Sequence, residues 1–113
     1  MADRGDVLRV KRRLGFAPKG EAESVVVVQA TPLNRVLQTL LVVPLDPAVG
    51  AYGSHPAVLR IARDESGSAV DQIAVPWRLR AVAADALAPG AVGRLKPQTQ
   101  AALDELLQLI LGI

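Results

Sequence analysis

The chain has 113 residues, half of them hydrophobic and few of them aromatic, and it carries a formal net charge of +2. This length suits one compact domain, which we expect over residues 1–113. The absence of cysteine and the presence of one histidine exclude disulfides, thiolate catalysis and cysteine-based zinc sites, so the sequence predicts neither a metal nor another cofactor.

The beginning of the chain predicts a short strand followed by a long loop. Arg4-Gly5-Asp6 predicts a turn, and residues 7–10, which are apolar except for Arg9, predict the strand. Residues 11–24 start with three basic side chains and then contain glycine and proline, which predicts a loop. Long loops in compact domains are often functional, so this loop is a candidate part of a site.

Two apolar runs dominate the centre of the sequence. Residues 25–29 begin with four valines, and residues 40–45 are almost all aliphatic. Apolar runs that are continuous rather than alternating predict strands covered on both faces. Residues 31–35, between the two runs, predict a turn or a single helical turn.

The second half of the chain predicts shorter elements. We expect a loop at 46–56, a strand at 57–61, a polar turn at 63–68, a strand or a pair of strands over 71–82, and a short helix at 83–88. Pro76 lies inside one of these segments and predicts an edge position or a bulge there.

The end of the chain predicts a helix that begins at Pro97 and stops at Gly112. Its apolar residues recur at the spacing of one helix face: Leu103, Leu106, Leu107, Ile110 and Leu111. All the elements together predict an antiparallel, strongly coiled or half-closed sheet with a terminal helix packed across it.

Four segments, in the same order along the chain, resemble the MazF/PemK family of toxins. The central segment runs from Val25 to Asp46 and contains Asn34-Arg35 and Val43-Pro44-Leu45. The flanking segments are Arg4-Gly5-Asp6-Val7, then Leu79-Arg80-Ala81-Val82, then Gly93-Arg94-Leu95-Lys96-Pro97 with the helix that ends in Leu111-Gly112-Ile113. The resemblance covers nearly the whole chain.

This resemblance implies both a fold and a function. The fold is a small, mostly antiparallel β-barrel of the SH3-like, CcdB/PemK type with a C-terminal α-helix. The function is that of a type II toxin: a homodimeric endoribonuclease that cleaves single-stranded mRNA at specific sequences without a metal, and that a cognate antitoxin neutralises. The sequence has no stretch near 18 uninterrupted apolar residues, so we expect a cytoplasmic protein with no membrane partner.

Two alternative functions stay open at this point. A relative of this fold can act without catalysis by binding a protein such as DNA gyrase, as CcdB does. A degenerate toxin can keep only the fold, the dimer and the binding of antitoxin. The residues at the catalytic positions bear on the choice among the endoribonuclease, the protein-binding relative and the degenerate toxin.

Metal-free RNA cleavage needs a base for the 2′-hydroxyl proton, an acid for the leaving 5′-oxygen and a cation near the phosphate. The family supplies an arginine before the first long strand and a threonine or serine after the second. This sequence has Glu23-Ser24 and Asp46 at those positions, and an anion at the first would repel a phosphate. The predicted catalytic residues are therefore Asp46 and, as the replacement cation from the loop, Arg12 and Arg13.

Trp77-Arg78 is the most distinctive candidate for RNA binding, because an indole can stack on an unpaired base and an adjacent guanidinium can hold a phosphate. The other RNA-binding candidates are Arg80, Lys19 and Asn34. Structural alternatives stay open for each type of residue: the tryptophan fills the core or a dimer interface, the two arginines are solvated on one face of a strand, and the asparagine holds its own turn.

The chain offers two further basic or titratable features. His55 could act as an acid–base group, although a single loop histidine is usually just solvated. Arg9, Lys11 and Arg13 alternate at the end of the first predicted strand, so they would share one face. That face is either an RNA-facing basic stripe or a solvated edge.

Asp71-Gln72 resembles an Asp-Gln pair in which some family members use the aspartate as the base. An alignment without gaps, counted back from Arg80 and Gly93, puts that pair at Trp77-Arg78 instead. We therefore interpret Asp71 as a turn or strand-start residue.

Overall fold

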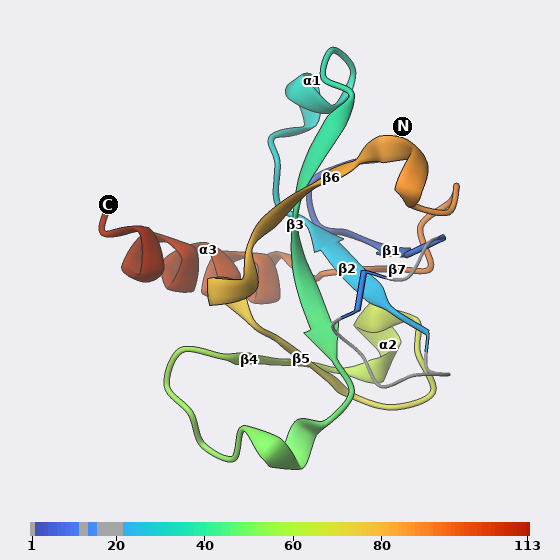
Figure 1. Cartoon of the computed structure of the whole chain (residues 1–113). Helices are drawn as coiled ribbons and strands as arrows, with labels where there is room; N and C mark the ends of the chain where they lie inside the picture. Colours follow the sequence, from blue (N-terminus) through green and yellow to red (C-terminus); the bar gives the residue numbers. More distant parts are fainter. Residues whose placement is uncertain (1, 12–13, 16–21) are drawn as a thin grey trace.

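We describe a computed structural model of the chain, which places residues 2–11, 14–15 and 22–113. Within these residues, seven strands form one curled antiparallel sheet, shown in Figure 1. The strands are β1 (Asp6–Arg9), β2 (Ser24–Val27), β3 (Thr39–Asp46), β4 (Leu59–Ile61), β5 (Gln72–Ala74), β6 (Arg80–Ala83) and β7 (Gly93–Arg94).

The long strand β3 organises the sheet. One of its edges pairs with β2, and the strand order continues through β1 to β7. Its other edge pairs with β6 along residues 39–42 and with β5 at residues 45–46, and β4 lies outside β5. Two strands sharing one edge bend the sheet into a half-closed barrel, so the predicted fold of a small antiparallel barrel with a C-terminal helix is confirmed.

Both faces of the central strands are buried. Val26 and Val43 belong to a cluster that includes residues of the C-terminal helix. Val25 and Val42 belong to a second cluster on the opposite face. Because successive side chains of a strand point to opposite faces, only continuous apolar runs can fill both clusters. The prediction of strands covered on both faces is therefore confirmed for most of residues 25–29 and 40–45, although β2 already ends at Val27 and Leu41 is 41% exposed.

The helices are short except for the last one. They are α1 (Thr31–Asn34), α2 (Arg63–Ser66) and α3 (Pro97–Leu111), with 3₁₀ turns η1 (Val49–Ala51), η2 (Pro76–Arg78) and η3 (Ala84–Ala86). None of the helices in the described part of the chain combines the length and the apolar character that a membrane span requires.

Helix α3 has the predicted bounds, with Pro97 in its first turn and Gly112 in the left-handed conformation after its last. Leu103 and Leu107 of the predicted stripe are buried against the sheet. Leu111 was expected on the same stripe and is exposed, because the last turn extends beyond the edge of the sheet (Figure 1). The predicted stripe is wrong at that residue.

Pro76 has a different role from the one predicted. It is buried and starts η2, between β5 and β6, so it marks neither an edge strand nor a bulge. Its fixed φ angle and missing N–H group favour a tight turn at this point. The 71–82 segment is therefore a pair of strands with a 3₁₀ turn between them, and Arg78 lies in that turn rather than in a strand.

Two other expectations differ from the structure in detail. Residues 83–88 contain only the single turn η3 instead of a helix, and the polar segment 63–68 contains the single helical turn α2. The two-residue strand β7 was not predicted, because it is too short to show a periodic pattern.

Candidate functional site

The site is built around Asp46, the last residue of β3. Its Oδ1 accepts a hydrogen bond from the backbone N–H of Ala48 at 2.9 Å. Its Oδ2 accepts one from the hydroxyl of Tyr52 at 2.6 Å and one from Nη1 of Arg78 at 3.3 Å. The carboxylate therefore joins the β3–β4 loop to η2, two segments that are distant along the chain.

These contacts decide the charge states of the site. Burial by itself raises the pKa of Asp46, but the hydrogen bonds from Tyr52, Ala48 and Arg78 outweigh it, and the net pKa is lowered. Burial, together with the bond to the Asp46 carboxylate, raises the pKa of Tyr52. At neutral pH the site thus holds an ionised aspartate, a neutral hydroxyl donor and a guanidinium.

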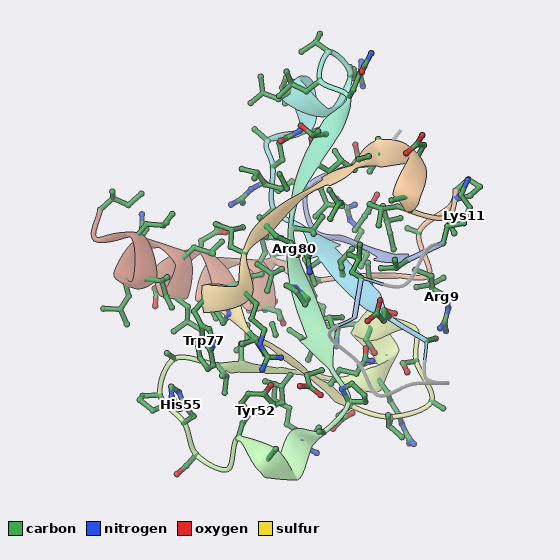
Figure 2. The ribbon with its side chains drawn as sticks, in the orientation of Figure 1. Arg9, Lys11, Tyr52, His55, Trp77 and Arg80 are labelled. Atoms are coloured by element: carbon green, nitrogen blue, oxygen red, sulfur yellow. The ribbon has the colours of Figure 1, made fainter. Side chains whose placement is uncertain are left out.

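Three rings gather next to this carboxylate, and we call Tyr52, His55 and Trp77 the aromatic cluster. The Trp77 ring centroid lies 5.0 Å from that of His55 and 6.4 Å from that of Tyr52. The Arg78 guanidinium lies over the Tyr52 ring, 5.9 Å from its centroid. Figure 2 shows these rings together at one side of the molecule, and Trp77 is 43% exposed, so it is not a core residue.

Two arginines contribute positive charge to this face. Arg80 pairs with Val42 across the β3–β6 ladder, and Val42 and Asp46 point to the same face of β3 because they are an even number of residues apart. The Arg78 side chain reaches that face through its bond to Asp46 and stays 39% exposed. The two were expected as neighbours on one strand; that expectation is wrong for Arg78, because Pro76 places it in η2.

Asn34 is buried, and its side chain is used within the fold. Its amide donates to the backbone carbonyl of Ala2 at 3.0 Å, and its Oδ1 accepts from Nε2 of Gln29 at 2.8 Å. The side chain thus ties α1 to the N-terminal segment and to Gln29, and these bonds reach outside the predicted turn at 31–35. These contacts give no support to the predicted contact with RNA.

Glu23, the anion expected to repel a phosphate at the position of the family's arginine, is buried. It is 2% exposed, and its carboxylate accepts a hydrogen bond from the backbone N–H of Leu14. Its charge is therefore directed into the fold at the base of the 11–24 loop. Arg12, Arg13 and Lys19, which were predicted to compensate for it, lie outside the described residues.

Asp71 has the structural role that the gapless alignment predicted. It lies directly before β5, and its Oδ1 accepts from the backbone N–H of Arg63 at 2.9 Å. Its Oδ2 accepts from both Nε and Nη2 of Arg60, at 3.0 and 2.9 Å. The bond from Arg63, followed by those from Arg60, lowers the pKa of Asp71. Its interpretation as a strand-start residue is confirmed.

The remaining candidates lie at different places. His55 is exposed, and its Nδ1 accepts from the backbone N–H of Ala57 at 3.1 Å. Strand β1 ends at Arg9, so Lys11 follows it in a bend, and Figure 2 shows both on the side away from the aromatic cluster. In the part of the chain that is described, no group of three His, Asp or Glu side chains is arranged to hold a metal ion.

The sequence did not predict that Tyr52 belongs to the site or that Asp46 and Arg78 pair. One available signal was composition, since the chain has a single tyrosine and a single tryptophan. Tyr52 also follows the end of β3 in a glycine-containing loop, where binding residues are common. The resulting arrangement combines a partly exposed guanidinium, a hydroxyl donor and an exposed indole.

The fold and this site define a small β-barrel protein with a cationic and aromatic surface at the end of its central strand. A family model described as PemK-like, MazF-like toxin of type II toxin–antitoxin system matches residues 3–111. The chain therefore belongs to the PemK/MazF toxin family. No curated protein sequence matches it significantly.

Several solved structures have a similar fold. An endoribonuclease in complex with its cognate antitoxin from a mycobacterial species has a TM-score of 0.78 and 18% identity, over 100% of this chain and 97% of that one. The Mycobacterium tuberculosis toxin MazF-mt6 has a TM-score of 0.74 and 12% identity, over 94% and 96%. MazE–MazF from Deinococcus radiodurans has a TM-score of 0.78 and 12% identity, over 99% and 97%. Because these sequence identities are low, the structural likeness establishes the fold alone.

Proposed function

We propose that this toxin is an endoribonuclease that cleaves single-stranded mRNA at specific sequences and without a metal. The observation that carries the proposal is the Arg78–Asp46 pair beside the aromatic cluster. In this pair the Arg78 guanidinium is a partly exposed cation near the end of β3, where the family has its threonine or serine. The position of the family's arginine holds the buried Glu23 instead. Single-stranded RNA has both groups that this surface suits, phosphates and unpaired bases.

The reaction is an internal displacement at phosphorus. The 2′-oxygen forms a bond to the phosphorus, the bond from phosphorus to the 5′-oxygen breaks, a base takes the 2′-hydroxyl proton, and the 5′-oxygen receives a proton. Negative charge builds up on the phosphorane-like transition state between these events. Arg78 stabilises that charge, which is the contribution that this geometry supports best.

Asp46 acts mainly as a positioning residue in this proposal. A carboxylate with a lowered pKa is a weak base at neutral pH, so proton abstraction is not its most effective role. It fixes Arg78 and Tyr52 instead. Trp77 and Arg80, which precede and follow Arg78 in the sequence, bind the RNA chain. Further cations for RNA binding come from the 11–24 loop: Arg12, Arg13 and Lys19.

The family and its neighbours also suggest the partners. One structural neighbour is an endoribonuclease bound to its cognate antitoxin, and others are MazE–MazF complexes. We infer that residues 1–113 act as one toxin domain, as a homodimer that a cognate antitoxin inhibits. Its substrate would place it in the cytoplasm.

The test is incubation of the purified protein with a long single-stranded RNA in EDTA. The proposal predicts cleavage at a short recurring motif. Intact RNA in this assay, together with growth arrest when the protein is expressed in cells, would contradict it. That outcome would support the second candidate, binding to a protein such as DNA gyrase, which is favoured by the replacement of both usual catalytic positions by Glu23-Ser24 and Asp46.

Replacement of Asp71 by asparagine should leave the rate of RNA cleavage within about two-fold of wild type, because its carboxylate is bonded to Arg60 and Arg63 and is not required as a base. Loss of a general base would instead slow the reaction by about 10²–10⁴-fold. Initial cleavage rates in EDTA distinguish the two. A drop of that size in a folded variant would show that Asp71, rather than the Asp46 site, carries the chemistry.

A further inference from the structure

A depression lies at one end of the sheet, where β1 ends and β2 and β5 begin. Pro47 belongs to its lining and directly follows Asp46 at the end of β3, so the depression adjoins the Asp46 site. Among the described residues no acidic side chain lines it, and the polar ones that do are Arg9, Ser24, Ser68 and Gln72.

The strand register directs three of these side chains to one face of the sheet. Arg9 lies opposite Ser24, and Ser24 lies opposite Leu45. Leu45 in turn lies opposite Ala74, and Gln72 precedes Ala74 by two residues on β5. Residues that pair directly, or that are two apart on a strand, share a face. Leu45 and Ala74 belong to the apolar cluster beneath α3, so this face changes from apolar to polar at the depression.

Gln72 has a buried polar group that the fold does not use. The residue is 4% exposed, and its Oε1 has no hydrogen-bond partner among the described residues. Buried polar side-chain atoms nearly always have a partner, and each exception requires an explanation. An unpartnered amide oxygen in a residue that lines a depression is suited to a bound group that can hydrogen-bond to it.

Arg9 supplies the positive charge of the depression. It is partly exposed and takes part in none of the ion pairs among the described residues. The carboxylate of Glu23, next to Ser24 in the sequence, accepts a hydrogen bond from the Leu14 backbone, and Glu23 is not among the described lining residues. An anion in the depression would therefore meet a guanidinium that no carboxylate already pairs.

This set of groups suits a ribose with its phosphate. A guanidinium binds phosphate oxygens, and serine hydroxyls can donate to them. A ribose 2′-hydroxyl both donates and accepts, so either end of the Gln72 amide can bind it. DNA has no 2′-hydroxyl, so an amide in this position would favour RNA over DNA.

We infer that this depression is a subsite for one ribose-phosphate unit of the RNA chain, in which Arg9 binds the phosphate and Gln72 recognises the 2′-hydroxyl. Pro47 connects it to Asp46, which holds Arg78, so an RNA chain at Arg78 can pass over the end of β3 into the depression. Figure 2 shows Arg9 well apart from the aromatic cluster, so the subsite is separate from it. This inference rests on the proposed function and extends its binding site.

The ligand for the test is adenosine 3′,5′-bisphosphate, which has one ribose between two phosphates and no phosphodiester bond to cleave. Its 2′-deoxy form lacks only the 2′-hydroxyl. NMR titration of isotopically labelled protein follows the side-chain amide of Gln72, and the indole N–H of the single tryptophan reports on the aromatic cluster. We expect the ribose form to bind with a dissociation constant about five-fold lower, the effect of roughly one hydrogen bond. The Gln72 amide should shift on binding more than the Trp77 indole.

Gln72→Leu removes the amide, so the ribose preference should disappear. Its melting temperature should be unchanged or higher, because an unpartnered polar group leaves a buried position; a Gln72 with a structural role would instead make the variant less stable. Gln100→Leu is the matched control, because Gln100 also has a buried Oε1 without a described partner but lies in α3. It should retain the ribose preference. Arg9→Ala should weaken the binding of both ligands.

The same variant connects the subsite to the RNA chain. In single-turnover cleavage, Gln72→Leu should raise the enzyme concentration that gives half the maximal rate by about five-fold. The maximal rate itself should stay near that of wild type, because the subsite binds RNA away from the reacting phosphate.

Two binding results would overturn the inference: equal affinity of the wild type for the two ligands, or an unchanged ribose preference in folded Gln72→Leu protein. Neither depends on RNA cleavage. An unchanged half-saturating concentration in a variant that has lost the preference would also overturn it, since the depression would then take a free nucleotide and not the RNA chain.

Failure of the proposed function is distinguishable from failure of the subsite. A protein that shows the ribose preference but leaves RNA intact would contradict the proposed endoribonuclease and keep the ribose-phosphate site. A protein that cleaves RNA with no response of the Gln72 amide would do the reverse.

Discussion

Replacing Arg78 with alanine should slow RNA cleavage in EDTA by about 10²–10³-fold, the usual cost of removing one group that stabilises transition-state charge. The Arg78 guanidinium is partly exposed and is held by Asp46 and by the face of the Tyr52 ring. Its role is strongest in the transition state, when the phosphate gains charge. The measured quantity is the single-turnover rate at saturating enzyme, which separates chemistry from RNA binding.

The matched control for this change is Arg94→Ala. Arg94 pairs with Asp6 as Arg78 pairs with Asp46, and the two aspartate side chains are equally buried, at 12% exposure. Arg94 lies in β7, at the far end of the strand order from the site. Its loss should leave the rate near that of wild type. Equal rates for wild type and folded Arg78→Ala would show that Arg78 is not the catalytic cation.

Replacing Asp46 with alanine should affect both stability and cleavage. The change leaves the Ala48 N–H, the Tyr52 hydroxyl and the Arg78 guanidinium without their acceptor, so we expect the free energy of unfolding to fall by about 1–3 kcal/mol. With Arg78 no longer held, cleavage should slow by about 10–100-fold, as expected when positioning is lost. Denaturant unfolding and single-turnover rates measure the two effects.

Asp6→Ala is the control for the loss of a buried aspartate. It removes the partner of Arg94 and a bond from the Asp3 backbone, so it should lower stability while the folded protein keeps its cleavage rate. If Asp46→Ala loses only stability and its folded form cleaves at the wild-type rate, Asp46 has no positioning role in the reaction.

The same carboxylate predicts a pH dependence of stability. Because the pKa of Asp46 is lower in the folded protein than its ordinary value of 3.8, the ionised form stabilises the fold. This contribution is complete above the ordinary pKa and is lost as the pH falls through the lowered value. The difference in unfolding free energy between wild type and Asp46→Asn should therefore shrink on acidification, and a difference that grows in acid would contradict the pKa direction.

The sequence predicted the parts of the fold that depend on local pattern. The continuous valines of β2 are typical of a strand buried on both sides, and Pro97 and Gly112 are typical residues at the two ends of a helix. The terminal position of Leu111 was misjudged because periodicity does not show where the sheet beneath a helix ends. Strand β7 was missed because two residues have no period.

The site was predicted in part. Asp46 was singled out through the family resemblance, and Trp77 and Arg78 through their side-chain chemistry. The structure brings them together through Tyr52 and the Arg78–Asp46 bond. Their pairing depends on where the η2 turn returns the chain to the end of β3, which is tertiary information. The same limit explains Glu23, whose charge was expected to face the phosphate; only the fold shows that it is buried.

The central claim is that Arg78, rather than the arginines of the 11–24 loop, supplies the cation for cleavage. The most direct test compares the single-turnover cleavage of one RNA in EDTA by Arg78→Ala and by the double variant Arg12→Ala/Arg13→Ala, each shown to be folded by thermal unfolding. We predict that Arg78→Ala loses cleavage and that the double variant cuts at the same motif, slowed at most by weaker RNA binding. The reverse result, an active Arg78→Ala and an inactive double variant, would contradict the account.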